Sequence, residues 1–330
     1  MKLERKLKKL GFTKINEIDG KTVRMIAENV TDNITKAFPY IEEEYNNILA
    51  KLLNCKMYKT TITKNMPKIN YMYENQSIYF DSEIDLNNIS EQMIHECIHY
   101  IQDKRNKKGK LKKLGLCNFT DLSINGLGLN EGTVQYISSK CMKNEVKITQ
   151  KYNIRVKTIS SNYYPLLTSL IEQIIYLIGE EEIIKATLCI DTEFEDLFLN
   201  TYEENTKKII NILDKIINIE NKEKEIQMYY FEAQNMIFET YFNKICPKIE
   251  TENEVEFYLD KVEKYKDIIG KKIDKNYEEE DLFEIAAKSI IEKLDNRLYK
   301  INKEKSKNAL LIIAGNKITK LFKKLVAHFT

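Results

Sequence analysis

The sequence predicts an α+β fold that is mostly helical, with a mixed first segment followed by an all-helical second one. Three observations lead to this prediction. Apolar residues recur every three or four positions through most of the chain. The stretch from Tyr58 to Glu83 instead alternates and is rich in Thr, Ile, Tyr and Phe, as strands are. From Asn205 onward the helical pattern is broken only near Cys246-Pro247 and Gly270.

The length and composition suit a globular protein of two domains. The chain has 330 residues, of which 43% are hydrophobic and 31% charged, so it can bury a sizeable core under a charged surface. We place the boundary near residue 205, which gives a first domain of residues 1–204 and an all-helical second domain of residues 205–330. In the first domain, helices and a sheet extend to about residue 103, and a helical lower half covers residues 120–204.

Charge and cysteine content narrow the class of protein. The 52 basic and 50 acidic residues nearly cancel, which argues against a nucleic-acid binder because such a protein needs a net basic field. The six cysteines form no CxxC pair, which favours a reducing compartment. No apolar signal region and no run of about 18 apolar residues is present. We therefore expect a cytoplasmic location and no transmembrane segment, with export by another route left open.

The first elements follow from periodicity. Residues 21–54 predict one or two amphipathic helices, because apolar side chains such as Ile26, Val30 and Ile34 share a face. Residues 58–83 predict two or three strands, with a hairpin turn at Glu74 and Asn75.

The next segment predicts a helix that begins at a cap and ends near Asp103. Asn88 is a favourable N-cap residue, and Glu91 three positions later completes a capping-box pattern. The basic run Lys104–Lys113 is interpreted as a solvated loop or helix face. From Gly126 to about Glu204 the pattern predicts helices again.

The predicted helix carries an HExxH motif, His95-Glu96-Cys97-Ile98-His99. Positions i and i+4 lie on one face of a helix, so the two imidazoles can bind one zinc ion. Glu96 can then take a proton from a zinc-activated water that attacks a carbonyl. The chain contains only three histidines, so an HExxH motif that uses two of them would rarely arise by chance.

A catalytic zinc usually has three protein ligands, so a third is needed. The remaining histidine, His328, lies far away in a basic tail, which favours a carboxylate. The best candidate is Glu131, where a short glycine-containing segment leads into a helix. Glu145 and Glu172 are weaker alternatives. A structural role for Glu131, as an acidic residue favoured by the helix dipole, is the competing interpretation.

These motifs resemble a known family. HECIH followed by NEGTVQY resembles the gluzincins, thermolysin-like zincin metallopeptidases whose third zinc ligand is a glutamate. The strand NYMY followed by ENQSIYF resembles the edge hairpin that precedes the active-site helix in that family. The resemblance covers residues 58–204 and implies a zincin-like domain with a small edge sheet and an active-site helix. It implies one Zn²⁺ per chain held by His95, His99 and Glu131, and substrate binding at Asn70 and Tyr71.

The resemblance also raises two expectations about neighbouring side chains. Many family members have an acidic residue four positions after the glutamate ligand, where it orients a zinc histidine. Here that position is Gln135, whose carbonyl accepts a hydrogen bond but supplies no charge. The family also places a tyrosine or histidine donor near the developing oxyanion. With no histidine to spare, we expect Tyr164 in that role, with Tyr163 and Tyr136 as alternatives.

The last segment, Asn308 to Thr330, combines apolar residues with several lysines. It is interpreted either as a helix that packs its apolar face on its own domain or as a basic amphipathic helix. In the second case it would contact a partner or an anionic membrane surface.

The expected function is zinc-dependent hydrolysis of peptide bonds in a peptide or protein substrate, with Glu96 as general base. The alternative is a catalytically silent zincin scaffold that acts as a protein-binding or regulatory module. A metal-dependent hydrolase of non-peptide substrates is a third reading of HExxH. The intact Glu96 discriminates against the scaffold, since a scaffold has no chemical need for it.

Overall fold

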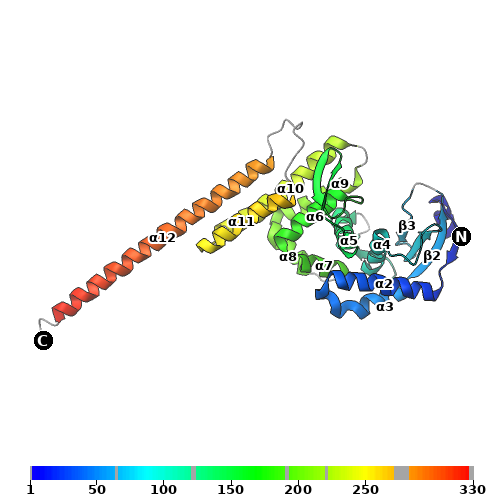
Figure 1. The fold of residues 1–330 in the computed structure, drawn as a ribbon, viewed down its shortest axis with the longest axis horizontal. Helices are drawn as coiled ribbons and strands as arrows, with labels where there is room; N and C mark the ends of the chain where they lie inside the picture. Colours follow the sequence, from blue (N-terminus) through cyan, green and yellow to red (C-terminus); the bar gives the residue numbers. More distant parts are fainter. Residues whose placement is uncertain are drawn as a thin grey trace.

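The computed structural model describes residues 2–63, 66–119, 124–189, 193–219, 222–270 and 282–326, with side chains described between residues 5 and 307. The architecture is α+β and mostly helical, as the sequence predicts, with the sheet nearest the N-terminus at one end and the long last helix projecting at the other (Figure 1). The helices are α1 (Lys2–Lys9), α2 (Gly20–Ala37), α3 (Tyr45–Leu53), α4 (Glu91–Gln102), α5 (Leu127–Cys141), α6 (Pro165–Ile178), α7 (Glu180–Leu188), α8 (Glu193–Tyr202), α9 (Thr206–Asn218), α10 (Glu223–Ile245), α11 (Glu252–Ile268) and α12 (Leu282–Val326), with short 3₁₀ turns at Pro39–Glu44, Glu203–Asn205 and Cys246–Lys248. The strands are β1 (Phe12–Glu17), β2 (Lys56–Ile62), β3 (Ile69–Met72), β4 (Ser77–Asp81), β5 (Asp103–Arg105), β6 (Leu111–Leu114), β7 (Cys117–Phe119), β8 (Ile124–Asn125), β9 (Lys147–Lys151) and β10 (Ile154–Thr158).

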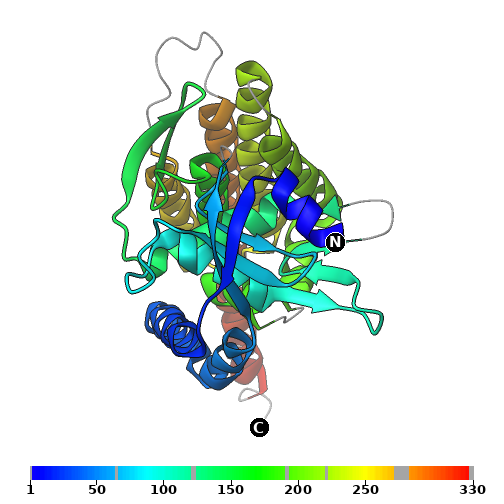
Figure 2. The same cartoon turned by 90° about the vertical axis from the view of Figure 1, so that its right-hand side faces the viewer.

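The first sheet has the order β1-β2-β4-β3, so β3 is an edge strand. This confirms the predicted strands, and the hairpin turn between β3 and β4 includes Glu74 and Asn75 as expected. Strand β4 is antiparallel to β3 and parallel to β2. Figure 2 looks onto this sheet, with β1 in front and the helices α2 and α3 below it. These two helices confirm the helical prediction for residues 21–54.

Helix α4 lies between the edge of this sheet and α5. Its N-cap is Ser90, which has an extended backbone and whose hydroxyl oxygen accepts the N–H of Met93 at 3.2 Å. The prediction of Asn88 as the N-cap is therefore wrong. The reason is a turn at Asp85, whose carboxylate accepts the Asn87 N–H at 3.0 Å and the side-chain amide of Asn88 at 2.5 Å. The Asn88 side chain therefore serves this turn and does not cap α4. The C-terminus at Gln102 agrees with the prediction.

Two small sheets interrupt the regions predicted as loop or helix. The Lys104–Lys113 run forms most of the β5–β6 hairpin of a four-stranded antiparallel sheet. Residues 147–158, expected to be helical, form the β9–β10 hairpin. Its turn residues Tyr152 and Asn153 both have positive φ, as a two-residue hairpin turn requires. On β10, buried and less buried positions alternate, a period of two that lysine-rich composition concealed.

Helix α5 is the central element of the fold. Twelve of its 15 residues are buried, because α4, α6 and α9 all pack on it. Its first turn is capped from another helix: the Asp214 carboxylate of α9 accepts the N–H groups of Gly126 and Gly128 at 2.9 and 2.8 Å. A carboxylate at a helix N-terminus satisfies free N–H groups and opposes the helix dipole. The entry of α5 is therefore set by α9.

Close approach of α5 and α9 requires a glycine. A Cβ at Gly128 would lie 2.2 Å from the carbonyl oxygen of Leu213, which is far inside van der Waals contact. The buried apolar side chains from Val23 on α2 to Ile301 on α12 form one cluster, so the predicted domains 1–204 and 205–330 share a hydrophobic core.

Among the described residues from Thr206 onward the chain is mostly helical, with the predicted interruptions at Cys246–Lys248 and after Ile268. The prediction of only these two breaks is wrong, because α9 ends at Asn218 and α10 begins at Glu223. Among the described helices, none has both the length and the apolar character needed to cross a bilayer. The backbone of the expected basic helix is helical to Val326, whereas His328 lies outside the described residues.

Replacing Gly128 with alanine should lower the free energy of unfolding by about 1–3 kcal/mol, because the added methyl forces α5 and α9 apart. The matched control is Gly20→Ala at the start of α2, where no atom lies within 4 Å of the added Cβ. It should change stability by less than about 0.5 kcal/mol. Urea denaturation of both variants measures the difference, and equal stabilities would contradict the close contact between α5 and α9.

Candidate metal centre

The HExxH side chains project from α4 toward α5. His95 and His99 lie one turn apart, and both are buried, with only 7% and 6% of their surface exposed. The intervening apolar residues face the opposite way: Cys97 and Ile98 are fully buried in the core. Cys97 is therefore a core residue, as its spacing predicts.

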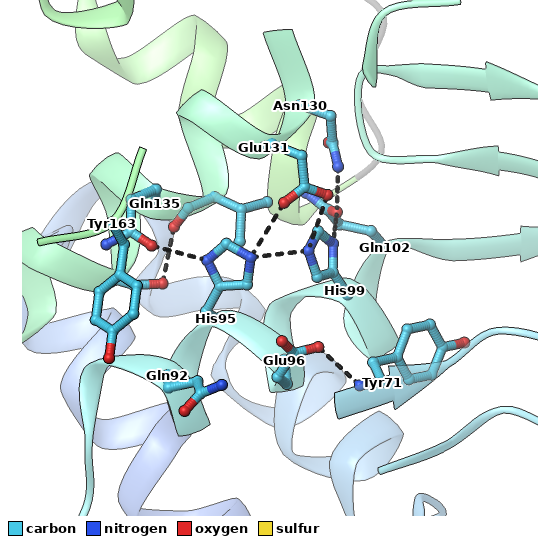
Figure 3. Close-up of polar contacts among 12 residues, drawn as sticks. Tyr71, Gln92, His95, Glu96, His99, Gln102, Asn130, Glu131, Gln135 and Tyr163 are labelled. Carbon is cyan, nitrogen blue, oxygen red and sulfur yellow. Dashed lines mark hydrogen bonds and ion pairs between the residues drawn. The ribbon is translucent and has the colours of Figure 1, made fainter. Parts of the chain in front are cut away.

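Glu131 of α5 meets both histidines (Figure 3). Its two carboxylate oxygens lie 3.3 Å from Nε2 of His95 and 3.3 Å from Nε2 of His99, and the two Nε2 atoms are 3.0 Å apart. Among the described residues, these three form a group of acidic, histidine or cysteine side chains that could hold a metal ion. The structure brings together the three residues that the sequence proposed as ligands.

The spacing of the donor atoms suits a small tetrahedral cation. Ligand atoms about 2.0–2.2 Å from a tetrahedral Zn²⁺ lie about 3.3–3.5 Å from one another. The distances among the three donors here are 3.0–3.3 Å. Two imidazoles and one carboxylate are also a donor set that zinc prefers in catalytic sites. The residues therefore fit a divalent cation.

Each imidazole is oriented by an amide oxygen behind it. Nδ1 of His95 lies 3.0 Å from Oε1 of Gln135, and Nδ1 of His99 lies 3.4 Å from Oε1 of Gln102. A hydrogen bond from Nδ1 leaves the Nε2 lone pair free for a metal. Gln135 thus occupies the position expected from its spacing, and both supporting groups are uncharged.

These amides are held by further buried groups. The Gln135 amide nitrogen donates to Glu91 at 2.6 Å and to Ser160 at 3.0 Å. The Gln102 oxygen accepts the side-chain amide of Asn130 at 3.2 Å. Sequence reasoning missed Gln102 and Asn130, although Gln102 lies three residues after His99 on the same helix and Asn130 precedes Glu131.

The charges of the three candidate ligands are coupled. Burial favours a neutral Glu131, but His99 and His95 outweigh it and hold its pKa well below the ordinary value. Burial likewise lowers the pKa of His99, but the Glu131 carboxylate outweighs it and raises that pKa to about 9. The site therefore favours one negative carboxylate facing positive charge, which a proton or a metal cation can supply.

Glu96 lies beside this group and contacts the edge strand. Its Oε2 accepts the backbone N–H of Tyr71 at 2.7 Å (Figure 3). Burial raises the pKa of Glu96, although the two histidines and the Tyr71 N–H act in the opposite direction. A carboxylate with a raised pKa is a better proton acceptor near neutral pH than an ordinary glutamate.

The outer edge of β3 is turned toward α4. Besides the Tyr71 N–H, the carbonyl of Ile69 accepts the Gln92 amide of α4 at 3.1 Å. The Tyr71 hydroxyl donates to Asp103 at 2.5 Å, which ties β3 to the end of α4. The side-chain amide nitrogen of Asn70 instead donates to the carbonyl of Pro67 at 2.6 Å, so this side chain stabilises the loop before β3.

Tyr164, the preferred one of the three candidate tyrosines, lies beside His95. Its ring stacks on His95 with centroids 6.2 Å apart, and it adopts a left-handed conformation at the start of α6. Burial, and then the carboxylates of Glu131 and Glu96, raise its pKa, so the hydroxyl keeps its proton and can donate. Tyr136 donates to Glu180, and the carbonyl of Tyr163 accepts Ser160 Oγ at 2.6 Å.

The alternative ligands lie elsewhere. Glu172 accepts the backbone N–H of Ile159 at 2.9 Å, and burial raises its pKa to about 7. Glu145 is exposed between α5 and β9. Neither belongs to the group formed by His95, His99 and Glu131.

Comparison of the chain with protein-family models, with curated proteins and with solved structures finds no match.

Glu131→Ala should lower zinc affinity by more than about a hundredfold, because a ligand contributes more than the second-shell groups whose loss costs 10–100-fold. The control is Glu145→Ala, which removes an exposed carboxylate and should leave affinity unchanged. Metal analysis of the purified proteins and competition with a chelator measure the zinc content and zinc affinity of both variants. Full zinc occupancy in Glu131→Ala would remove this residue from the site.

Zinc affinity should fall with falling pH. The metal has to displace the proton that His99 holds at pH values below its pKa of about 9, and the unprotonated fraction that can bind metal falls about tenfold for each pH unit below that pKa. Between about pH 8 and pH 6 the apparent affinity should decrease at least about tenfold per pH unit. Chelator competition across this range checks it, and a constant affinity would contradict the coupling of His99 to Glu131.

Proposed function

We propose that the chain is a zinc-dependent peptidase of the gluzincin type, with a zincin-like first domain. The observation that carries the proposal is the meeting of His95, His99 and Glu131, with the carboxylate of Glu96 beside them on the same helix. A site that only held a metal for stability would have no need of Glu96 at its edge.

Zinc bound to the three ligands would supply Lewis-acid chemistry, polarising a carbonyl and making water nucleophilic near neutral pH. Gln135 and Gln102 keep the two imidazoles in the orientation that presents Nε2. Tyr164 is the proposed donor to the oxyanion, since its ring lies beside His95 and its hydroxyl remains protonated.

Glu96 acts as the general base. It accepts a proton from the attacking water while the water oxygen bonds to the peptide carbon. It then returns the proton to the amine nitrogen as the C–N bond breaks. The raised pKa of Glu96 suits both directions of transfer.

The edge strand supports a peptide as substrate. An extended peptide can pair with the outer edge of β3 through backbone hydrogen bonds that do not depend on its sequence. The Ile69 carbonyl and the Tyr71 N–H, now bonded to Gln92 and Glu96, are the groups it would use. Pairing at Tyr71 would also release Glu96 for proton transfer, so substrate binding and activation of the base are linked.

Glu96→Gln should reduce hydrolysis by at least about 10²–10⁴-fold and leave zinc content and folding intact, because Glu96 acts on water and not on the metal. The assay is cleavage of a mixed-sequence peptide library by the zinc-loaded protein, read by mass spectrometry. Turnover of Glu96→Gln at the parent rate would contradict the general-base role. A zinc-loaded parent that leaves both the library and unfolded protein substrates intact would contradict the peptidase assignment and favour a silent scaffold.

A further inference from the structure

Helix α12 extends well beyond the helices that support it. It has 45 residues and runs antiparallel to α11, and buried residues on its first half, such as Leu294 and Ile301, join the core. Lys305 pairs at 3.0 Å with Glu252, the first residue of α11, so α11 offers no further surface beyond this point. The remaining 21 helical residues reach about 30 Å further, away from the other elements (Figure 1).

The sequence of this projecting segment is strongly one-sided in charge. Between Lys305 and Thr330 there are six lysines and no acidic residue, in a chain whose charges otherwise nearly cancel. The segment therefore forms a separate cationic region, distant along the fold from the candidate metal centre on α4 and α5 (Figure 1).

The same segment is amphipathic. On a helical wheel with 100° between successive positions, the sequence of residues 314–325 separates its apolar positions from its lysines. The apolar positions are Ala314, Ile318, Leu321, Phe322 and Leu325, and the basic positions are Lys317, Lys320, Lys323 and Lys324. In proteins, most of the stability of a helix comes from packing of its apolar face, so a partner is expected to cover this stripe.

We propose that residues 305–326 bind the surface of an anionic lipid bilayer as an interfacial helix. An apolar stripe opposite a lysine face, within a helix that cannot span a bilayer, is the pattern of helices that lie in the headgroup region. The positive charge of this segment favours an anionic lipid surface over other partners. A second copy of the helix would bring lysines to lysines with no acidic partner, and a nucleic acid would leave the apolar stripe uncovered.

A single tryptophan can report the binding, because the chain contains none. Phe322→Trp in the full-length protein places the probe on the apolar stripe. The matched control is Tyr299→Trp on the supported half of α12, where the native side chain is 66% exposed. Vesicles of equimolar phosphatidylcholine and phosphatidylglycerol should shift the emission of Phe322→Trp to the blue and leave that of Tyr299→Trp unchanged. Pure phosphatidylcholine vesicles should shift neither.

Charge removal gives the second measurement. Replacing Lys317, Lys320, Lys323 and Lys324 with glutamine should lower the affinity for the anionic vesicles, measured by co-sedimentation, by about two to three orders of magnitude. The reason is that each lysine near such a surface contributes about 1 kcal/mol of binding free energy, or about fivefold in affinity. The control replaces four exposed lysines of the β5–β6 hairpin and its flanks, Lys104, Lys107, Lys108 and Lys112, and should bind as the parent does. Added salt should weaken parent binding.

Three results would overturn the proposal: equal emission of Phe322→Trp with anionic and neutral vesicles, loss of binding in the hairpin variant alone, or a blue shift without vesicles that grows with protein concentration. The last would mean that a second copy covers the stripe. Thermal unfolding of each variant verifies that the body is intact.

Discussion

The capping of α5 by Asp214 is the interaction on which the candidate site depends. Glu131 lies in the second turn of α5, and the N-terminus of that helix is bound by a carboxylate from α9. Gly128 allows the two backbones to approach closely enough for this contact. Since α4 also packs on α5, a shift of the N-terminus of α5 would move Glu131 relative to both histidines. The helical second half of the chain thus sets the position of a proposed metal ligand in the first half.

The site combines few charges with many neutral supports. Two imidazoles and one carboxylate face one another, and the groups behind the imidazoles are the amides of Gln135 and Gln102. In the proposed zinc enzyme, an uncharged outer shell leaves more positive charge at the centre than an aspartate would. This favours polarisation of a substrate carbonyl over tightness of metal binding. Buried amide networks of this kind also fix orientation, because each misplaced group would lose a hydrogen bond that water cannot replace.

The position of Glu96 links the proposed chemistry to the sheet. It belongs to the helix that carries the histidines, and its carboxylate reaches across to the backbone of β3. An edge strand normally leaves unpaired N–H and C=O groups that invite further pairing. Here side chains of α4 occupy two of them. A peptide bound along β3 would replace these two side-chain contacts with backbone hydrogen bonds. Its binding would then place the substrate next to Glu96, the proposed general base.

Local sequence patterns determined the fold class and several individual elements of this protein. Helical periodicity, strand alternation and the spacing of His95, Glu96 and His99 each depend on neighbours within a few residues, so the mostly helical α+β class, the edge hairpin and the HExxH helix could be predicted. Glu131 could be proposed as the third ligand because the chain has so few histidines. The tertiary structure alone decided which glutamate meets the imidazoles, that Gln102 and Asn130 support His99, and that Asp214 holds α5. These contacts join residues up to 88 positions apart, and their geometry arises only when the helices pack. The errors have the same origin: the cap at Ser90 and the strands near residues 104–113 and 147–158 depend on turns and pairings that composition does not reveal.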